Sequence, residues 1–184
     1  MKSVFLSHFY KSSTPGFSGN KDFELKTVKS IATGSSCNQK LIVMSNHVGT
    51  HIDCPKHFDE QGRSLSSYSA QDWIFSSVQL INIKVDEGQL IGISHFLEVI
   101  NENADFLILK TGFEAYRSQE KYWSKNPGIH PEVGSYLRKN FPKLKGIGFD
   151  FISVTSYLHR EAGREAHRQP PVSYTHLTLP TTPY

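Results

Sequence analysis

Three histidines and one aspartate lie within eleven positions of the sequence, His47, His51, Asp53 and His57, in the order H-x3-H-x-D-x3-H. Imidazole nitrogen and carboxylate oxygen are together the ligands that suit Zn2+, Mn2+ or Fe2+. The alternative interpretation is a polar, hydrogen-bonded cluster at the end of a strand. The density of ligand-type residues favours a divalent metal site.

The residues between these side chains indicate a loop. Poor helix formers, among them Gly49 and Pro55, fill the gaps, so the four-residue spacing of His47 and His51 does not indicate a helix. In an extended stretch His51 and Asp53, two apart, point to the same side. Gly49 permits a backbone reversal that brings His47 to them. The motif is therefore expected in an irregular loop after a strand.

Apolar runs predict the elements that must position this loop. Residues 40–46 form a continuous apolar run that ends at the motif and is typical of a buried strand. Further strands are predicted over 3–8, 23–33, 78–85, 104–111 and 144–154. Helices are predicted over 130–141, over 159–168 and, more briefly, after Ser94 as an N-cap. This pattern predicts a mixed α/β class.

Composition limits the class of protein. The chain of 184 residues predicts one domain, and its formal net charge of +3 comes from scattered bases, which argues against a nucleic-acid partner. No apolar run is long enough for a membrane span, and no signal-peptide pattern opens the chain, so a cytoplasmic protein is expected. Cys37 and Cys54 are interpreted as reduced thiols. The sequence also lacks a G-x-S-x-G elbow, which argues against a serine hydrolase.

The segment HVGTHIDCPKHF resembles H-x-G-T-H-x-D-x-P-x-H-F, the signature of the cyclase-type metal-dependent hydrolases, which include bacterial kynurenine formamidase (arylformamidase) and isatin hydrolase. Other segments resemble that family in the same order, so the resemblance covers residues 3–168: LSHFYKSSTPGFSG, ADFLILKTGFEAYR, GIGFDFISV and HREAGREAHR. The resemblance implies the swivelling β/β/α single domain of that family, commonly a homodimer.

The resemblance also implies roles for individual residues. His47, His51 and Asp53 match metal ligands, and a late histidine ligand falls at His167, with His159 as the rival. His57 matches the active-site histidine, either as general acid/base or as a further ligand. In kynurenine formamidase a glutamate beyond the late histidine completes a second metal site. No counterpart of it occurs here, which places a dinuclear site in doubt.

The activity implied is hydrolysis of a C–N amide bond in a small molecule by a Zn2+- or Mn2+-dependent enzyme. The named substrate is N-formyl-L-kynurenine, cleaved to L-kynurenine and formate in tryptophan catabolism. The alternatives are an isatin-type lactam hydrolase, a polyketide-type cyclase and a non-catalytic metal-binding homologue. Aromatic residues are candidates for the floor of an aryl pocket: Trp73, Phe75, Tyr116, Tyr122 and Trp123.

The last residues do not fit the rest of the pattern. Residues 172–182, VSYTHLTLPTT, resemble one reading frame of a sequencing transposase adapter. The native domain is therefore expected over 1–171, truncated at its C-terminus, and 172–184 are expected to be a non-native tail. Such a tail has no evolved partner surface and is expected to make few contacts.

Overall fold

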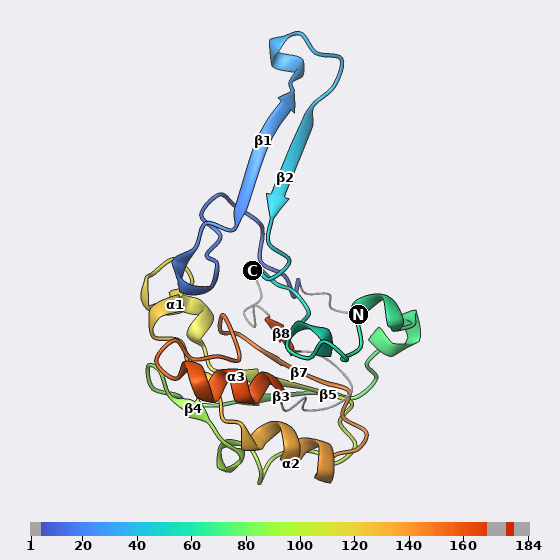
Figure 1. Cartoon of the computed structure of the whole chain (residues 1–184), viewed down its shortest axis with the longest axis vertical. Coiled ribbons are helices and arrows are strands. Elements are labelled where there is room, and N and C mark those ends of the chain that lie inside the picture. Colours follow the sequence, from blue (N-terminus) through green and yellow to red (C-terminus); the bar gives the residue numbers. More distant parts are fainter. Residues whose placement is uncertain (1–4, 169–175, 179–184) are drawn as a thin grey trace.

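The computed structural model describes residues 5–168 and 176–178. It consists of an α/β body from which a long hairpin projects (Figure 1). The body is built on a parallel sheet with the order β3-β5-β7-β8. Its strands are β3 (Val78–Asn82), β5 (Phe106–Lys110), β7 (Gly146–Phe149) and β8 (His176–Thr178).

The core lies around the two middle strands of this sheet. The first four residues of β5 and all four of β7 are buried, as expected for parallel strands that are covered on both faces. Helix α2 (Glu132–Asn140) begins after Pro131 and packs Val133 and Leu137 into this core. Helix α3 (Arg160–Arg168) lies beside α2 and buries Ala166 in the same cluster.

Short elements complete the body. Strands β4 (Leu90–Ile91) and β6 (Gly128–Ile129) form a small parallel pair, and helix α1 is Lys121–Ser124. Seven 3-10 turns join these elements in the described residues: η1 (Phe17–Gly19), η2 (Ile31–Thr33), η3 (Pro55–His57), η4 (Leu65–Ser67), η5 (Ala70–Trp73), η6 (Ile93–His95) and η7 (Phe113–Tyr116). None of the helices in the described ranges has the length and apolarity to cross a membrane.

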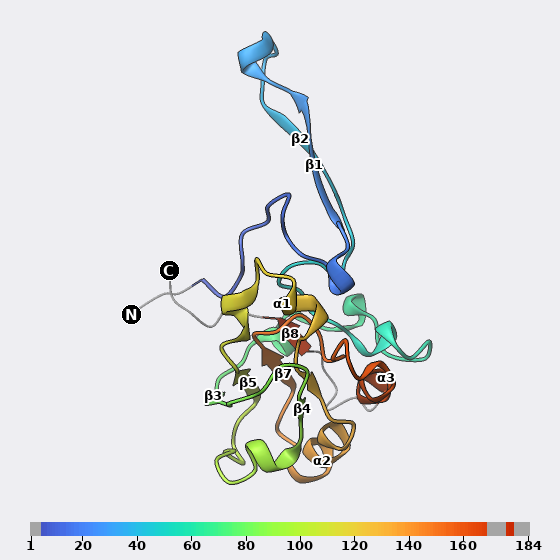
Figure 2. The same ribbon diagram turned by 90° about the vertical axis from the view of Figure 1, so that its left-hand side faces the viewer.

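The hairpin pairs β1 (Phe23–Lys29) with β2 (Gln39–Met44) in antiparallel register, Phe23 opposite Met44. It extends well beyond the body in both views (Figures 1 and 2). Among its strand residues Phe23 alone is buried, where its ring stacks on Tyr10. The rest of both strands is exposed.

Most of the predicted elements are confirmed. The strands at 104–111 and 144–154 and the helices at 130–141 and 159–168 form, with ends that shift by a few residues. Three predictions are wrong. The described part of the first strand, Phe5–His8, is irregular, and the helix after Ser94 is only the turn η6. The run 40–46 is a strand over Gln39–Met44 but an exposed one, because no element within the described ranges covers either face of the hairpin.

The expectation that the tail makes few contacts is wrong for His176–Thr178. These residues pair with Ile147–Phe149 of β7 as the edge strand of the sheet. Without β8, β7 would present unpaired N–H and C=O groups, and a short extended segment can satisfy them whatever its origin. The other residues of 172–184 lie outside the described ranges, and the domain boundary at 171 stays a prediction.

Candidate metal centre

The histidine motif lies at the base of the hairpin. After β2 ends at Met44, the N–H of Ser45 still donates to the carbonyl of Asp22, and then the chain turns into the body. Gly49 has φ +72°. A side chain there would collide with the ring of Tyr10, since an added Cβ would lie 2.5 Å from it. The predicted backbone reversal at Gly49 is therefore present.

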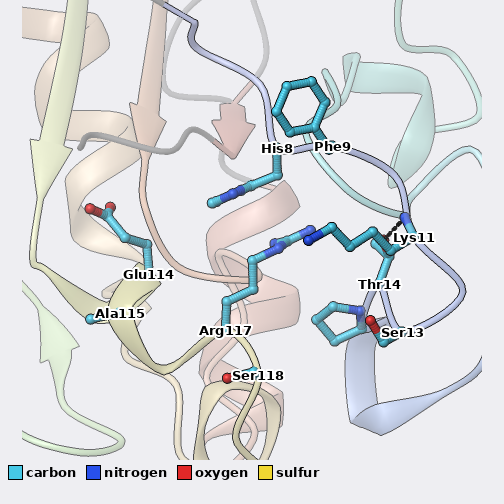
Figure 3. A pocket seen from close by; sticks show the side chains of 10 residues that line it. His8, Phe9, Lys11, Ser13, Thr14, Glu114, Ala115, Arg117 and Ser118 are labelled. Atoms are coloured by element: carbon cyan, nitrogen blue, oxygen red, sulfur yellow. Dashed lines mark hydrogen bonds between the residues drawn. The ribbon is translucent and has the colours of Figure 1, made fainter. Parts of the chain in front are cut away.

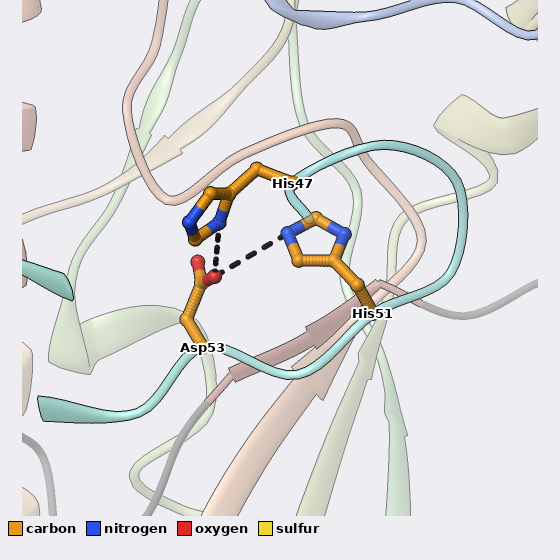
Figure 4. Close-up of side chains that lie close together, drawn as sticks. All are labelled: His47, His51 and Asp53. Atoms are coloured by element: carbon orange, nitrogen blue, oxygen red, sulfur yellow. Dashed lines mark ion pairs between the residues drawn. The ribbon is translucent and has the colours of Figure 1, made fainter. Parts of the chain in front are cut away.

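This reversal brings two histidines onto one carboxylate (Figure 4). Oδ1 of Asp53 lies 2.6 Å from Nδ1 of His47 and 3.4 Å from Nε2 of His51. The Asp53 side chain is only 7% exposed, so its charge is held away from bulk water. One ligand atom from each of the three residues lies within 4.8 Å of the others, an arrangement that could hold a metal ion.

A second group of three shares the same aspartate. Asp53, His57 and His167 also offer ligand atoms within 4.8 Å of one another, and His167 comes from the last turn of α3. The rings of His47 and His57 stack with centroids 3.7 Å apart. The expected approach of His167 to the motif is therefore confirmed, whereas its role as a ligand stays a prediction.

His159, the rival, lies exposed just before α3. It belongs to neither group of ligand-type side chains found in the described residues. Its carbonyl accepts the N–H of Gly163, so it serves to start the helix.

Backbone carbonyls orient two of the rings. Nδ1 of His51 lies 3.0 Å from the carbonyl oxygen of Gly49, and Nδ1 of His167 lies 2.8 Å from that of Gly163. An Nδ1–H donating to a carbonyl leaves Nε2 as the nitrogen with the lone pair, the usual arrangement around a metal-binding histidine. The sequence did not predict the roles of these two carbonyls, because every residue has a backbone carbonyl and no side-chain type marks the ones that bind a histidine.

The third ring is held by a side chain. Nδ2 of Asn46 lies 3.0 Å from Nε2 of His47, which leaves Nδ1 to face Asp53. The hydroxyl of Thr50 accepts the N–H of His8 and so ties the N-terminal segment to the loop.

The electrostatics of this cluster suit a cation. Burial of the His51 ring favours its neutral form, but the hydrogen bond and charge of Asp53 and the hydrogen bond to Gly49 outweigh it and raise the pKa of His51. Nδ1 of His47 is buried and has no well-aligned hydrogen-bond partner in the described part of the chain. A divalent ion would take the place of the proton on His51 and would also satisfy Nδ1 of His47. The donor set therefore fits a metal.

The cluster opens onto a cleft of 850 Å³. His47, His51 and His57 line it together with Leu6 and Ile52. This volume is in the range of small-molecule sites. Asp53 lies behind the histidines, so a ligand in the cleft would meet imidazoles first.

Of the aromatic candidates for an aryl pocket, Tyr122 is the one that reaches the motif. It lines a small cavity with His47, His51 and Arg117. The others pack elsewhere: Trp73 on Tyr68, Phe75 on Phe106, Tyr116 on Phe113, and Trp123 against the core.

With this geometry in view, comparison with known proteins identifies the family. Residues 4–156 match the model of the Cyclase family. The chain belongs to the Cyclase family. The match ends before α3, so the assignment of His167 depends on the geometry above.

Relatives of this Cyclase-family chain include named hydrolases. A kynurenine formamidase of Geobacillus thermodenitrificans is 28% identical over 154 residues, which are 84% of this chain and 71% of that protein. An uncharacterized protein of Haemophilus influenzae is 36% identical over 112 residues, 58% of this chain and 78% of that protein.

Solved structures confirm the predicted fold. Isatin hydrolase A from Labrenzia aggregata superposes with a TM-score of 0.76 at 19% identity, covering 95% of this chain and 78% of that one. A structure described as a potential metal-dependent hydrolase with cyclase activity gives a TM-score of 0.71 at 18% identity, covering 96% and 81%. The mixed α/β fold is therefore that of the cyclase and isatin hydrolase group.

Proposed function

We propose that this protein is a metal-dependent amidohydrolase of the arylformamidase type, which cleaves N-formyl-L-kynurenine to L-kynurenine and formate. The observation that carries the proposal is the convergence of four histidines on the buried carboxylate of Asp53 at the wall of an 850 Å³ cleft. Relatives named kynurenine formamidase support the choice of substrate.

His47, His51, Asp53 and His167 would hold the ion, Zn2+ or Mn2+. When bound, such an ion lowers the pKa of water toward neutrality and polarises a carbonyl, the two requirements for amide hydrolysis. The chain's own contribution is orientation. The carbonyls of Gly49 and Gly163 fix the rings of His51 and His167, so the lone pairs face the site before the ion arrives.

His57 is the proposed proton shuttle. Unlike Asp53 it is exposed, and it lines the cleft while its ring stacks on that of His47. An imidazole exposed to the cleft can exchange protons with solvent near neutral pH and can hand one to the leaving amine. The alternative role for His57, as a metal ligand, has a different experimental signature.

Four histidine variants test these roles: His51→Ala, His57→Ala, His159→Ala and His167→Ala. His51→Ala should abolish binding of Zn2+ or Mn2+, since it removes an oriented ligand, and with it hydrolysis of N-formyl-L-kynurenine. His57→Ala should lower turnover by about 10²–10⁴ with metal content retained. His159→Ala is the matched control and should change neither. Metal content by elemental analysis and hydrolysis by release of formate are the two measurements.

The outcomes separate the alternatives. Loss of metal in His57→Ala would make His57 a ligand, and loss of metal in His159→Ala but not His167→Ala would overturn the late ligand assigned here. A wild-type protein that binds metal but hydrolyses no amide would be a non-catalytic metal-binding homologue, or a cyclase that needs a different substrate.

A second candidate activity is opening of the lactam ring of isatin. The superposition on isatin hydrolases favours it. Isatin and N-formyl-L-kynurenine should be assayed side by side on the same metal-loaded sample. Higher kcat/KM on isatin would replace the arylformamidase proposal with this one.

We further propose a cytoplasmic homodimer that acts on a small-molecule amide, without a nucleic-acid or membrane partner. Cys37 and Cys54 are both free thiols, which suits a reducing compartment. The apolar, uncovered hairpin supports a second copy as partner. Light scattering after gel filtration would test the dimer.

A further inference from the structure

A second cleft, of 340 Å³, lies between the N-terminal segment and η7 (Figure 3). Its charged lining is mostly basic: Lys11 and Arg117 are cations, and Glu114 is the carboxylic acid. Arg117 and His8 both line this cleft, and in Figure 3 the Glu114 carboxyl points away from Arg117. The cleft therefore offers positive charge to a ligand.

The body core fixes the position of Arg117. At the end of β7, the carboxylate of Asp150 accepts hydrogen bonds from the N–H of Thr111 at 2.9 Å and its hydroxyl at 2.6 Å, and from the N–H of Gly112 at 2.6 Å. This anchors the turn, where Gly112 has φ +78°, and η7 starts there. Arg117 follows directly, its N–H bonded to the carbonyl of Glu114.

The Arg117 side chain has no counterion among the residues that the structure describes. Its Nη2 is buried with no hydrogen-bond partner in the described residues, and Nη1 has only a long contact of 3.4 Å to the hydroxyl of Tyr122. No carboxylate in the ranges described pairs with it. Tyr122 is no counterion, because burial raises the pKa of its phenol to about 12. The residue as a whole is partly exposed, but its buried Nη2 is costly to leave unsatisfied, and an anion at the guanidinium would satisfy it.

Arg117 also connects this cleft to the metal centre. It lines a void of about 10 Å³ with His47, Gly49, His51 and Tyr122, so the residue borders the motif loop as well as the second cleft. The void itself is too small for a ligand group. An acidic group of a substrate whose amide is at the histidines would reach Arg117 from the second cleft, which Arg117 also lines. A guanidinium suits a carboxylate because its planar N–H groups bind both oxygens.

We propose that Arg117 anchors a carboxylate of the substrate, so that the enzyme selects anionic aryl amides over neutral ones. Lys11 lines the same cleft and adds a second positive charge. His8 stays neutral beside it, because burial and the charge of Arg117 lower the pKa of His8 to about 4, against the effect of Glu114. The identity of the substrate rests on the proposed amide hydrolysis. The binding of a carboxylate at Arg117 can be tested without it.

The kinetic experiment compares N-formyl-L-kynurenine with the same formamide lacking the carboxylate. In Arg117→Gln, KM for the acid should rise about 10–100-fold with kcat nearly unchanged, since a lost charge-assisted pair acts on binding. KM for the neutral analogue should not change. Arg117→Lys should recover part of the loss. Lys121→Gln, which removes a cation that pairs with Glu87 outside the cleft, is the control. Equal loss on both substrates would overturn the inference.

The binding experiment does not need catalysis. Calorimetry of L-kynurenine against its decarboxylated analogue should show about a tenfold preference for the carboxylate in the wild type. Arg117→Gln should erase that preference while Lys121→Gln keeps it. If the wild type hydrolyses neither formamide, the proposed function fails. The calorimetric comparison still shows whether Arg117 binds a carboxylate. A preference unchanged by Arg117→Gln, or no measurable carboxylate binding at about 10 mM, contradicts the anchor.

Stability provides a further control. Removal of this partly buried charge should leave the melting temperature of Arg117→Gln unchanged or higher, since no ion pair of the described residues is broken. A fall of more than about 5 °C would mean that Arg117 holds the fold, and would overturn an assignment based on binding.

Discussion

The hairpin and the body use the same kind of residue in opposite ways. Leu107 of β5 is 0% exposed, whereas Ile42 of β2 is 55% exposed, although both lie in continuous apolar runs. In the body a strand is covered by neighbouring strands and helices. In the hairpin nothing in the described chain covers either face. An apolar run therefore predicts a strand, but its burial depends on elements distant in sequence.

The difference also explains where the site lies. Loop 45–58 joins the uncovered hairpin to the packed body, and His167 of the body meets it there. An isolated two-stranded hairpin is marginal in water. Anchoring of the motif therefore comes from the body side, through Asp53, Gly49 and the N-terminal segment packed on them.

The largest expected effect comes from a matched pair of leucines. Leu107→Ala should lower the free energy of unfolding by about 2–5 kcal/mol, because it leaves a cavity in the core. Leu41→Ala on the hairpin should change it by less than about 0.5 kcal/mol in dilute, monomeric protein. Urea unfolding at low protein concentration measures both. Equal losses would show that the hairpin is packed, and would remove the contrast.

Local pattern predicted much of the body. Residues 104–111 and 144–154 are apolar throughout, and a strand buried on both faces requires that composition. The helix at 159–168 was recognisable from charge and spacing. By contrast, exposure of 40–46 and the loss of the helix after Ser94 depend on tertiary neighbours, which no local window contains.

The site divides in the same way. The spacing of four residues that are close in sequence was enough to predict the cluster: His47, His51, Asp53 and His57. Arg117 is a lone basic residue in a loop, and only the turn anchored by Asp150 shows why it faces the motif. A long-range contact of that kind leaves no periodicity in the sequence.

A second prediction concerns Asp150, a buried carboxyl group of the body. Burial raises the pKa of Asp150 to about 6, with the hydrogen bond and charge of Glu114 adding to it and the hydrogen bonds from Thr111 opposing it. The unfolded value is about 3.9. Between these values the native state holds the proton that the unfolded state has lost, so stability should fall as pH rises from about 4 to 6.

The expected loss across this window is of order 1–3 kcal/mol, measured by urea unfolding at several pH values. Asp150→Asn should flatten the slope at the cost of a hydrogen bond to the turn. Hydrogen exchange should show the loss in β5, β7 and η7, and not in the hairpin. A slope that survives in Asp150→Asn would assign the effect to another group.

The smallest effect on folding is expected on the hairpin itself, where the register defines two faces. Directly opposed residues of an antiparallel pair share a face. Leu25 lies opposite Ile42, which gives one face an apolar pair, whereas Glu24 lies opposite Val43 on the other face and forms an ion pair with Lys26 at 3.1 Å. If a second copy covers the hairpin, the face of Leu25 and Ile42 is the one that it should cover.

The double variant Leu25→Thr/Ile42→Thr should therefore weaken the proposed dimer at least about tenfold, since burial of two such side chains is worth more than 1.4 kcal/mol. The unfolding free energy of the dilute monomer should stay within about 0.5 kcal/mol of wild type. The control Glu24→Thr/Val43→Thr changes the opposite face and should leave the dimer intact. Analytical ultracentrifugation gives both dissociation constants. If the two double variants weaken association equally, the contact does not select a face, and the hairpin must be stabilised by something other than a second copy docked on its apolar side.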